Sequence, residues 1–291
     1  MSSMPDHIRK AIPALGQNAA PDNSAAVRAM YAPMLKGVMD GVASKIDIAY
    51  GDHARQKLDV YYKEGGSGKP VFIYIPGGGF VGGDKRSDEL YYGNIGACAA
   101  RDGMVCVIAN YRLAPEFKWP IASKDIESAV IWTRAHAKEF GGDSDKVVIM
   151  GHSAGAAHVA TFLFDPDIKG EKLVKGGLLS SGPYRIAKGT KAANMLAYYG
   201  EDEGQFERRS ALNYVKDSKI PICISVAEYD PSNLITPGFE LANLLVERSG
   251  TGPSIRCAEG HNHFSTVSSM GTTDDDFAKF TLGFVWQCAG A

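Results

Sequence analysis

Residues 146–155 read KVVIMGHSAG, and this stretch decides the fold. A short apolar, β-branched run leads directly into Gly151-His152-Ser153-Ala154-Gly155, and the helix-forming run AAHVATFLF follows at once. This is the GxSxG pattern in the strand-turn-helix setting of a nucleophile elbow. The two glycines suit that turn because residues without a side chain let the strand and the helix pass closely. Ser153 is therefore the candidate nucleophile.

Short β-rich runs alternate with helical patterns from Lys45 onward. Seven runs are bounded by Gly, Pro or charged residues: KIDIAY, KLDVYY, PVFIYI, MVCVIA, KVVIMG, KGGLLS and PICISV. An eighth run begins the segment SIRCAEGHNHFS. The helical patterns between them fall at about 88–101, 122–139, 155–164, 233–249 and 274–288. This alternation predicts an α/β fold with a mostly parallel sheet of about eight strands, helices on both faces, and an active site at the carboxyl ends of the strands.

The length of 291 residues favours one large domain with small additions. We expect an α/β core over residues 45–291, preceded by an N-terminal helical cap segment over residues 1–44 and interrupted by a short cap insertion at about 182–217. Either segment could roof a pocket. For the first, two interpretations stay open: it lines the substrate site, or it packs an apolar face on the body through Met30, Met34, Leu35 and Met39.

Composition excludes several classes of partner. Lys and Arg number 31 against 33 Asp and Glu, and without a basic run the net charge of −2 predicts no nucleic-acid partner.

The start, MSSMPDHIRKAIPALGQ, lacks an apolar stretch of signal-peptide length, and no membrane-length apolar run follows, so we expect a soluble, cytoplasmic protein. The five cysteines form no CxxC pair, so they are not expected to bind a metal. No other cofactor is expected. A homodimer stays open.

A serine hydroxyl needs a base within hydrogen-bond reach, and the base needs a carboxylate that orients it. In the run PICISVAEYDPSN, Asp230 follows the second strand after Ser153. We favour Asp230 as the orienting carboxylate over Glu228, which lies at the end of that strand. The loop in SIRCAEGHNHFS offers both His261 and His263, and spacing alone does not choose between them.

A glycine-rich loop is the candidate oxyanion hole. The strand PVFIYI ends in Pro76-Gly77-Gly78-Gly79-Phe80, where missing side chains leave backbone amides open to a substrate. The amides of Gly78 and Gly79, together with that of Ala154, would stabilise the negative charge that develops on an attacked carbonyl.

Six segments carry a resemblance that covers nearly all of residues 45–288: LDVYY, YIPGGGFVGGDK, NYRLAPEFKWP, GHSAG, AEYDP and HNHFS. They resemble the esterase branch of the α/β-hydrolase superfamily that includes hormone-sensitive-lipase-like carboxylesterases and arylformamidases. The resemblance implies the α/β-hydrolase fold with a small cap, an oxyanion hole at Gly78 and Gly79, Asp230 as acid, and His263 rather than His261 as base. One departure is Pro76, because the family usually has histidine before the three glycines.

Three functions are compatible with these residues. The first is hydrolysis of a small carboxylic ester through an acyl-enzyme, and the second is hydrolysis of an aryl formamide or another small amide with the same residues. The third is a small-molecule receptor with the same fold, the class that the plant gibberellin receptors resemble. Such receptors typically lose one of the serine, histidine and aspartate residues that catalysis needs. Candidate pocket-lining residues are aromatic: Phe80, Trp119, Tyr184, Tyr198 and Tyr199.

Overall fold

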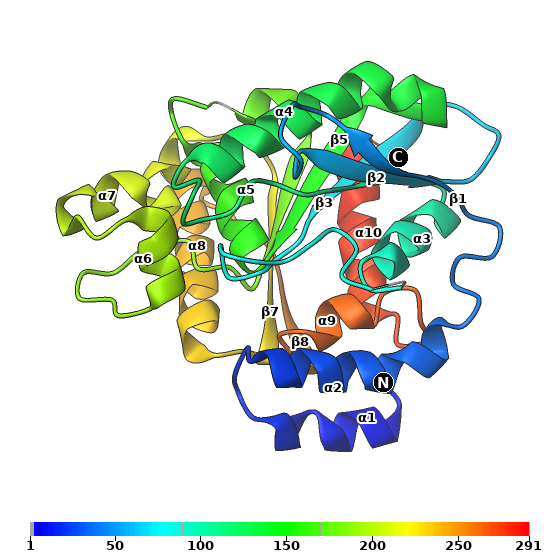
Figure 1. The fold of residues 1–291 in the computed structure, drawn as a ribbon, viewed down its shortest axis with the longest axis horizontal. Coiled ribbons are helices and arrows are strands. Elements are labelled where there is room, and N and C mark those ends of the chain that lie inside the picture. The colour runs from blue at the N-terminus through cyan, green and yellow to red at the C-terminus, as the bar shows by residue number, and fades with distance from the viewer. Residues whose placement is uncertain (1–2, 89, 169, 291) are drawn as a thin grey trace.

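The computed structural model describes residues 3–88, 90–168 and 170–290, with one eight-stranded sheet at their centre (Figure 1). The strand order is β1-β2-β4-β3-β5-β6-β7-β8; β2 pairs antiparallel with both β1 and β4, and every other pair is parallel. The prediction of a mostly parallel sheet is confirmed. The strands are β1 (Ala43–Ala49), β2 (Lys57–Tyr62), β3 (Lys69–Ile75), β4 (Val105–Ala109), β5 (Gly142–His152), β6 (Gly176–Ser180), β7 (Ile222–Tyr229) and β8 (Ser254–Asn262).

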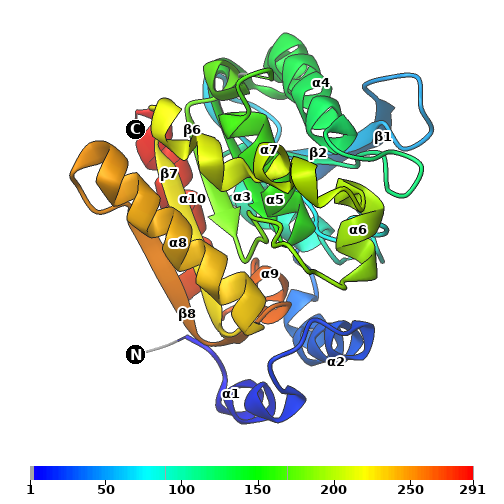
Figure 2. The ribbon, with the colours of Figure 1, turned by 90° about the vertical axis from the view of Figure 1, so that its left-hand side faces the viewer.

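Helices cover both faces of the sheet, as Figures 1 and 2 show. One face carries α3 (Gly93–Arg101) and α10 (Asp276–Ala289), and the other carries α4 (Ile121–His136), α5 (Ala154–Phe164) and α8 (Ser232–Ser249). Central strands are apolar throughout because both of their faces are buried, as in KPVFIYI of β3, where every residue after Lys69 is buried. None of the described helices has the length and apolar character to cross a membrane.

Helix α3 starts later than the sequence pattern predicts. The pattern predicts a helix from about residue 88, whereas α3 begins at Gly93. Tyr92 precedes it with φ of 72° and ψ of −29°, a left-handed conformation that a right-handed helix cannot contain. The chain therefore turns at Tyr92 before α3 begins.

The N-terminal segment forms α1 (Asp6–Ala11), α2 (Pro21–Tyr31) and a 3-10 helix over Ala32–Leu35. Figure 1 shows α1 and α2 at the lower edge beside α9 (Ser265–Ser268), and α2 contacts α9. Ile8, Ile12 and Val27 are completely buried in a cluster against Tyr229 and Phe264. These two aromatic residues stand next to Asp230 and His263 in the chain, so the N-terminal helices pack against both turns that carry the candidate acid and base.

The segment before β7 forms α6 (Ala193–Tyr199), α7 (Phe206–Arg209) and 3-10 helices over Glu203–Gln205 and Ala211–Asp217. Phe206 and Val215 are buried in the same apolar cluster as α4 and α5. Arg208 forms an ion pair of 2.5 Å with the buried Asp165. This segment is thus anchored on the body of the molecule by apolar packing and by charge.

Candidate active site

Ser153 lies between β5 and α5 with φ of 57° and ψ of −128°, a conformation that only a tightly enclosed turn maintains in a residue other than glycine. The flanking glycines are required by space. A Cβ on Gly151 would lie 2.4 Å from the carbonyl oxygen of Gly155, and a Cβ on Gly155 would lie 2.3 Å from that of Ile75. The GxSxG stretch therefore places the Ser153 side chain at the carboxyl end of β5.

Ser153, His263 and Asp230 form a continuous hydrogen-bonded chain. The Oγ of Ser153 lies 2.9 Å from Nε2 of His263, and Nδ1 of His263 lies 2.8 Å from Oδ1 of Asp230. Because a carboxylate only accepts, Nδ1 carries the proton and Nε2 is left as the acceptor for the serine hydroxyl. This arrangement allows His263 to take a proton from Ser153.

Asp230 is completely buried and is held by three donors. Its second oxygen, Oδ2, accepts from the Ser181 hydroxyl at 2.6 Å and from the Ala227 amide at 2.7 Å, while His263 contacts Oδ1. Burial pushes the pKa of Asp230 upward, but these hydrogen bonds outweigh burial and hold the pKa below its ordinary value. The carboxylate is therefore ionised beside the imidazole.

The alternative acid, Glu228, has a different partner. Its carboxylate is exposed and accepts from the Gly260 amide at 2.7 Å. Strand β7 ends at Tyr229, and the Asp230 amide donates to the Ala227 carbonyl at 3.1 Å, so Asp230 lies in a turn and its side chain does not follow the alternation of the strand. Of the two carboxylates, Asp230 is the one that contacts His263.

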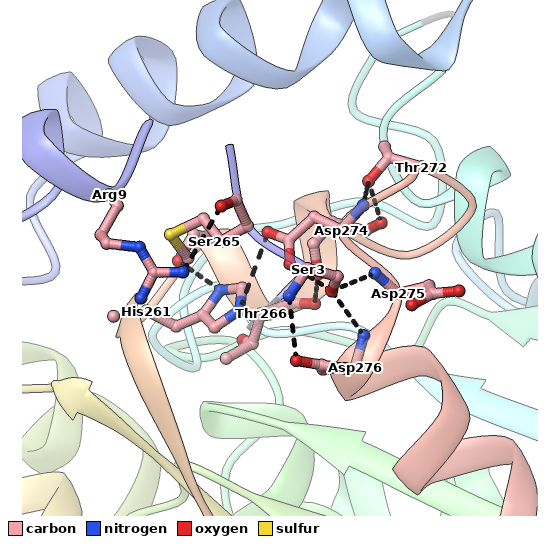
Figure 3. A network of polar contacts seen from close by, with 12 residues as sticks. Ser3, Arg9, His261, Ser265, Thr266, Thr272, Asp274, Asp275 and Asp276 are labelled. Carbon is pink, nitrogen blue, oxygen red and sulfur yellow. Dashed lines mark hydrogen bonds and ion pairs between the residues drawn. The ribbon is translucent and has the colours of Figure 1, made fainter. Parts of the chain in front are cut away.

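The second histidine, His261, belongs to a polar network with the N-terminal segment (Figure 3). Its Nδ1 lies 3.0 Å from the Ser265 hydroxyl, and its Nε2 lies 3.8 Å from Asp274. Asp274 is completely buried and also accepts from Tyr31 and Ser3. Asp274 is thus an internal acceptor that connects the N-terminal segment to the loop before α10.

His152, the variable residue of the GxSxG stretch, supports the base. Its Nε2 lies 2.9 Å from the carbonyl oxygen of His263, and the two rings are 4.6 Å apart. Burial and the neighbouring His263 lower the pKa of His152 to about 3, so the ring is neutral and donates through Nε2. Local sequence could not reveal this contact, because it joins residues 111 positions apart.

Buried histidines make stability depend on pH, because burial lowers the pKa values of His152, His158 and His261. The pKa values of His152 and His158 are both lowered by burial to about 3, against about 6.5 in an unfolded chain. Between these values the unfolded chain binds protons that the folded chain does not, so stability is full above about pH 6.5 and is lost as the pH falls. We expect the free energy of unfolding to drop by about 2 kcal/mol per histidine between about pH 7 and pH 5. Urea denaturation at the two pH values measures the drop.

A matched pair of variants tests the origin of this pH dependence. The variant His158→Gln removes one buried histidine with a lowered pKa and should reduce the loss by about 2 kcal/mol. His7→Gln removes an exposed histidine of α1 and should leave the loss unchanged. Equal stability at both pH values in the unsubstituted protein would contradict the assignment of neutral buried histidines.

The glycine loop after β3 faces Ser153. A Cβ on Gly77 would lie 2.8 Å from the Cβ of Ser153, so the loop approaches the serine as closely as the backbone allows. Gly78 and Gly79 have φ of 148° and 59°. Within the described residues, neither of their amides nor that of Ala154 donates to a protein acceptor. Three amide donors are therefore free to bind an oxyanion.

A cavity of about 450 Å³ opens over Ser153 and His263. Its wall is supplied by the glycine loop, the turns around Pro183 and Pro231, the start of α6, and the N-terminal residues 17–19. Its described lining contains no Asp, Glu, Lys or Arg. Most of the other side chains are carboxamides or apolar groups, among them Gln17, Asn18, Asn194, Asn233, Phe80, Met195, Leu234 and Phe264. The N-terminal segment thus contributes to the pocket wall, while α2 behind it packs on the body.

The five aromatic residues expected at the pocket divide into two groups. Among the described residues, Phe80 lines the cavity and the other four do not. Tyr198 stacks on Phe80 with ring centres 4.9 Å apart, and Tyr199 meets the same ring at 5.5 Å, so both lie behind it. Tyr184 is buried against Gly182, and Trp119 lies under Arg208. The structure differs from the expectation at these four positions because Tyr198 and Tyr199 pack behind Phe80, while Tyr184 and Trp119 pack on Gly182 and Arg208, and sequence spacing does not encode these side-chain directions.

No group of three His, Cys, Asp or Glu side chains within the described ranges is arranged to hold a metal ion.

Comparisons with known proteins agree with this fold. Residues 58–164 match the BD-FAE family. Esterase LipC of Mycobacterium tuberculosis is 37% identical over 110 residues, which are 37% of this chain and 27% of LipC. Esterase LipQ of the same organism is 28% identical over 211 residues, which are 65% of this chain and 49% of LipQ. The matched part thus spans at most about half of either relative.

A solved structure of a bacterial heroin esterase superposes with a TM-score of 0.72, at 22% identity and with 98% of each chain covered. At this identity the likeness concerns the fold alone. The sheet order, the position of Ser153 at the end of β5 and these matches agree with one another. The chain has the α/β-hydrolase fold, and the curated relatives LipC and LipQ to which it is similar are named esterases.

Proposed function

We propose that the protein is a serine hydrolase that cleaves small, uncharged carboxylic esters through an acyl-enzyme. The observation that carries this proposal is the unbroken hydrogen-bonded chain from Ser153 through His263 to the ionised Asp230. A protein that only binds a ligand has no need for a serine in a strained turn beside an oriented base. The names of the relatives LipC and LipQ support the same class of reaction.

The geometry supports the following sequence of steps. Oγ of Ser153 attacks the ester carbonyl while Nε2 of His263 takes the hydroxyl proton, and Asp230 stabilises the resulting imidazolium. The amides of Gly78, Gly79 and Ala154 bind the oxyanion. His263 then returns the proton to the departing alkoxide, and water, activated by the same nitrogen, releases the acid from Ser153.

The cavity favours a small substrate without charge. A volume of about 450 Å³ lies near the lower end of the range for small-molecule sites. A charged group would lose its hydration there without gaining an ionic partner, because the described lining contains no Asp, Glu, Lys or Arg. Carboxamide and apolar side chains instead suit an uncharged ester.

The test compares the wild-type protein with Ser153→Ala on two substrates, p-nitrophenyl acetate and N-formylkynurenine. We expect the acetate ester to be turned over with a pre-steady-state burst that the variant lacks. Faster turnover of the formamide would assign the same machinery to amides. Saturable ligand binding without any turnover dependent on Ser153 would contradict the proposal and favour a receptor.

A further inference from the structure

The loop that offers the oxyanion amides is held by a side chain of the segment before β7. Asn194, in the first turn of α6, donates from Nδ2 to the carbonyl oxygen of Gly79 at 3.1 Å. The contact is close enough that a Cβ on Gly79 would lie 3.3 Å from the same nitrogen. Asn194 is half-buried and also lines the cavity over Ser153.

The other carbonyls near the loop ends are held from elsewhere. The Gly82 amide donates to Gly78 at 3.0 Å, the Tyr111 hydroxyl to Pro76 at 2.9 Å, and the Ala114 amide to Phe80 at 3.1 Å. These three donors belong to the loop itself or to the segment after β4. Among the described residues of the segment before β7, Asn194 is the one that donates a hydrogen bond to this loop.

The hydrogen bond from Asn194 to the Gly79 carbonyl restricts the directions in which the oxyanion amides point. In a trans peptide the carbonyl and the following amide point in opposite directions, so the bond from Gly82 to the Gly78 carbonyl aims the Gly79 amide away from Gly82. The bond from Asn194 fixes the next peptide plane. Gly79, with φ of 59°, is thereby clamped between two fixed planes, although glycine is the residue with the softest backbone.

We infer that Asn194 is a positioning residue for the oxyanion hole: through the Gly79 carbonyl it couples the placement of α6 to the direction of the oxyanion amides. The inference rests on the proposed esterase function. Its consequence is specific, because an interaction that orients oxyanion donors acts on the transition state and leaves the binding of the uncharged ground-state ester almost unchanged.

Two substitutions separate this role from a contact with substrate. Asn194→Ala removes the donor, and Asn194→Asp keeps the shape but sets a carboxylate oxygen against the Gly79 carbonyl. We expect the acylation rate constant for p-nitrophenyl acetate to fall about 10- to 100-fold in the alanine variant and further in the aspartate variant. The substrate dissociation constant from the same burst measurements should stay within about twofold.

A transition-state analogue supplies the second readout. A trifluoromethyl ketone adds to the serine as an oxyanion, so its affinity should weaken by the same factor as the acylation rate in each variant. Asn243→Ala, which removes an exposed carboxamide of α8 bonded to Glu247, is the matched control and should match the wild type.

The possible results separate the inference from the function on which it rests. Weaker substrate binding with an unchanged acylation rate would overturn the inference, because Asn194 would then only contact the substrate. An unchanged rate and unchanged ketone affinity would overturn it as well, with the esterase function intact. A wild-type protein without any burst dependent on Ser153 would overturn the proposed function and the inference together.

Discussion

Replacing Ser153 by alanine is expected to lower kcat for p-nitrophenyl acetate by about 10⁵- to 10⁶-fold. The reason is geometric: Oγ of Ser153 is the one hydroxyl within hydrogen-bond reach of Nε2 of His263 among the described residues. Without it, His263 has no nucleophile to activate. Steady-state assays that detect residual hydrolysis above the buffer background measure the loss.

The control for this substitution is the fold of the variant. Alanine can occupy the same turn as serine, so the thermal unfolding midpoint of Ser153→Ala should lie close to that of the wild type. Residual turnover well above the expected level would show that another group performs the attack.

Asp230→Asn is expected to lower kcat about 10⁴-fold with little change in the fold. The amide that replaces the carboxylate can donate to Nδ1 of His263, which favours the tautomer with its proton on Nε2. That tautomer presents a donor to Ser153 and cannot take its proton. Comparison of kcat with the wild type over the same pH range measures the effect.

Glu228→Gln is the matched control, because it makes the same change of carboxylate to amide two residues earlier. The side chain is exposed, and the new amide oxygen can still accept from the Gly260 amide. Activity should therefore stay within about twofold of the wild type. A large loss in this variant with a small loss in Asp230→Asn would reverse the assignment of the acid.

Much of the fold could be predicted because its signals are local. Apolar runs such as PVFIYI and KVVIMG predict strands buried on both faces, and the structure confirms a mostly parallel sheet. The late start of α3 could not be predicted, because the left-handed backbone of Tyr92 depends on its packing and tyrosine has no preference for that conformation.

Part of the candidate site could likewise be predicted from local sequence, and part could not. The motif around Ser153 and the order of the strands led to Asp230, whereas the choice of His263 over His261 came from the resemblance of HNHFS to known esterases. Contacts such as Asn194 with Gly79, 115 positions apart, leave no local pattern. The same holds for residues 17–19, which reach the cavity because α1 and α2 fold back over the turns after β7 and β8.

The most direct test of the central claim is to trap the acyl-enzyme. The protein is mixed with p-nitrophenyl acetate, quenched in acid within the burst phase, digested and mapped by mass spectrometry. The account predicts one acetyl group on the peptide that contains Ser153, absent when Ser153 is replaced by alanine. Acetylation of a different residue, or a burst without any covalent adduct, would contradict the proposal that Ser153 is the nucleophile.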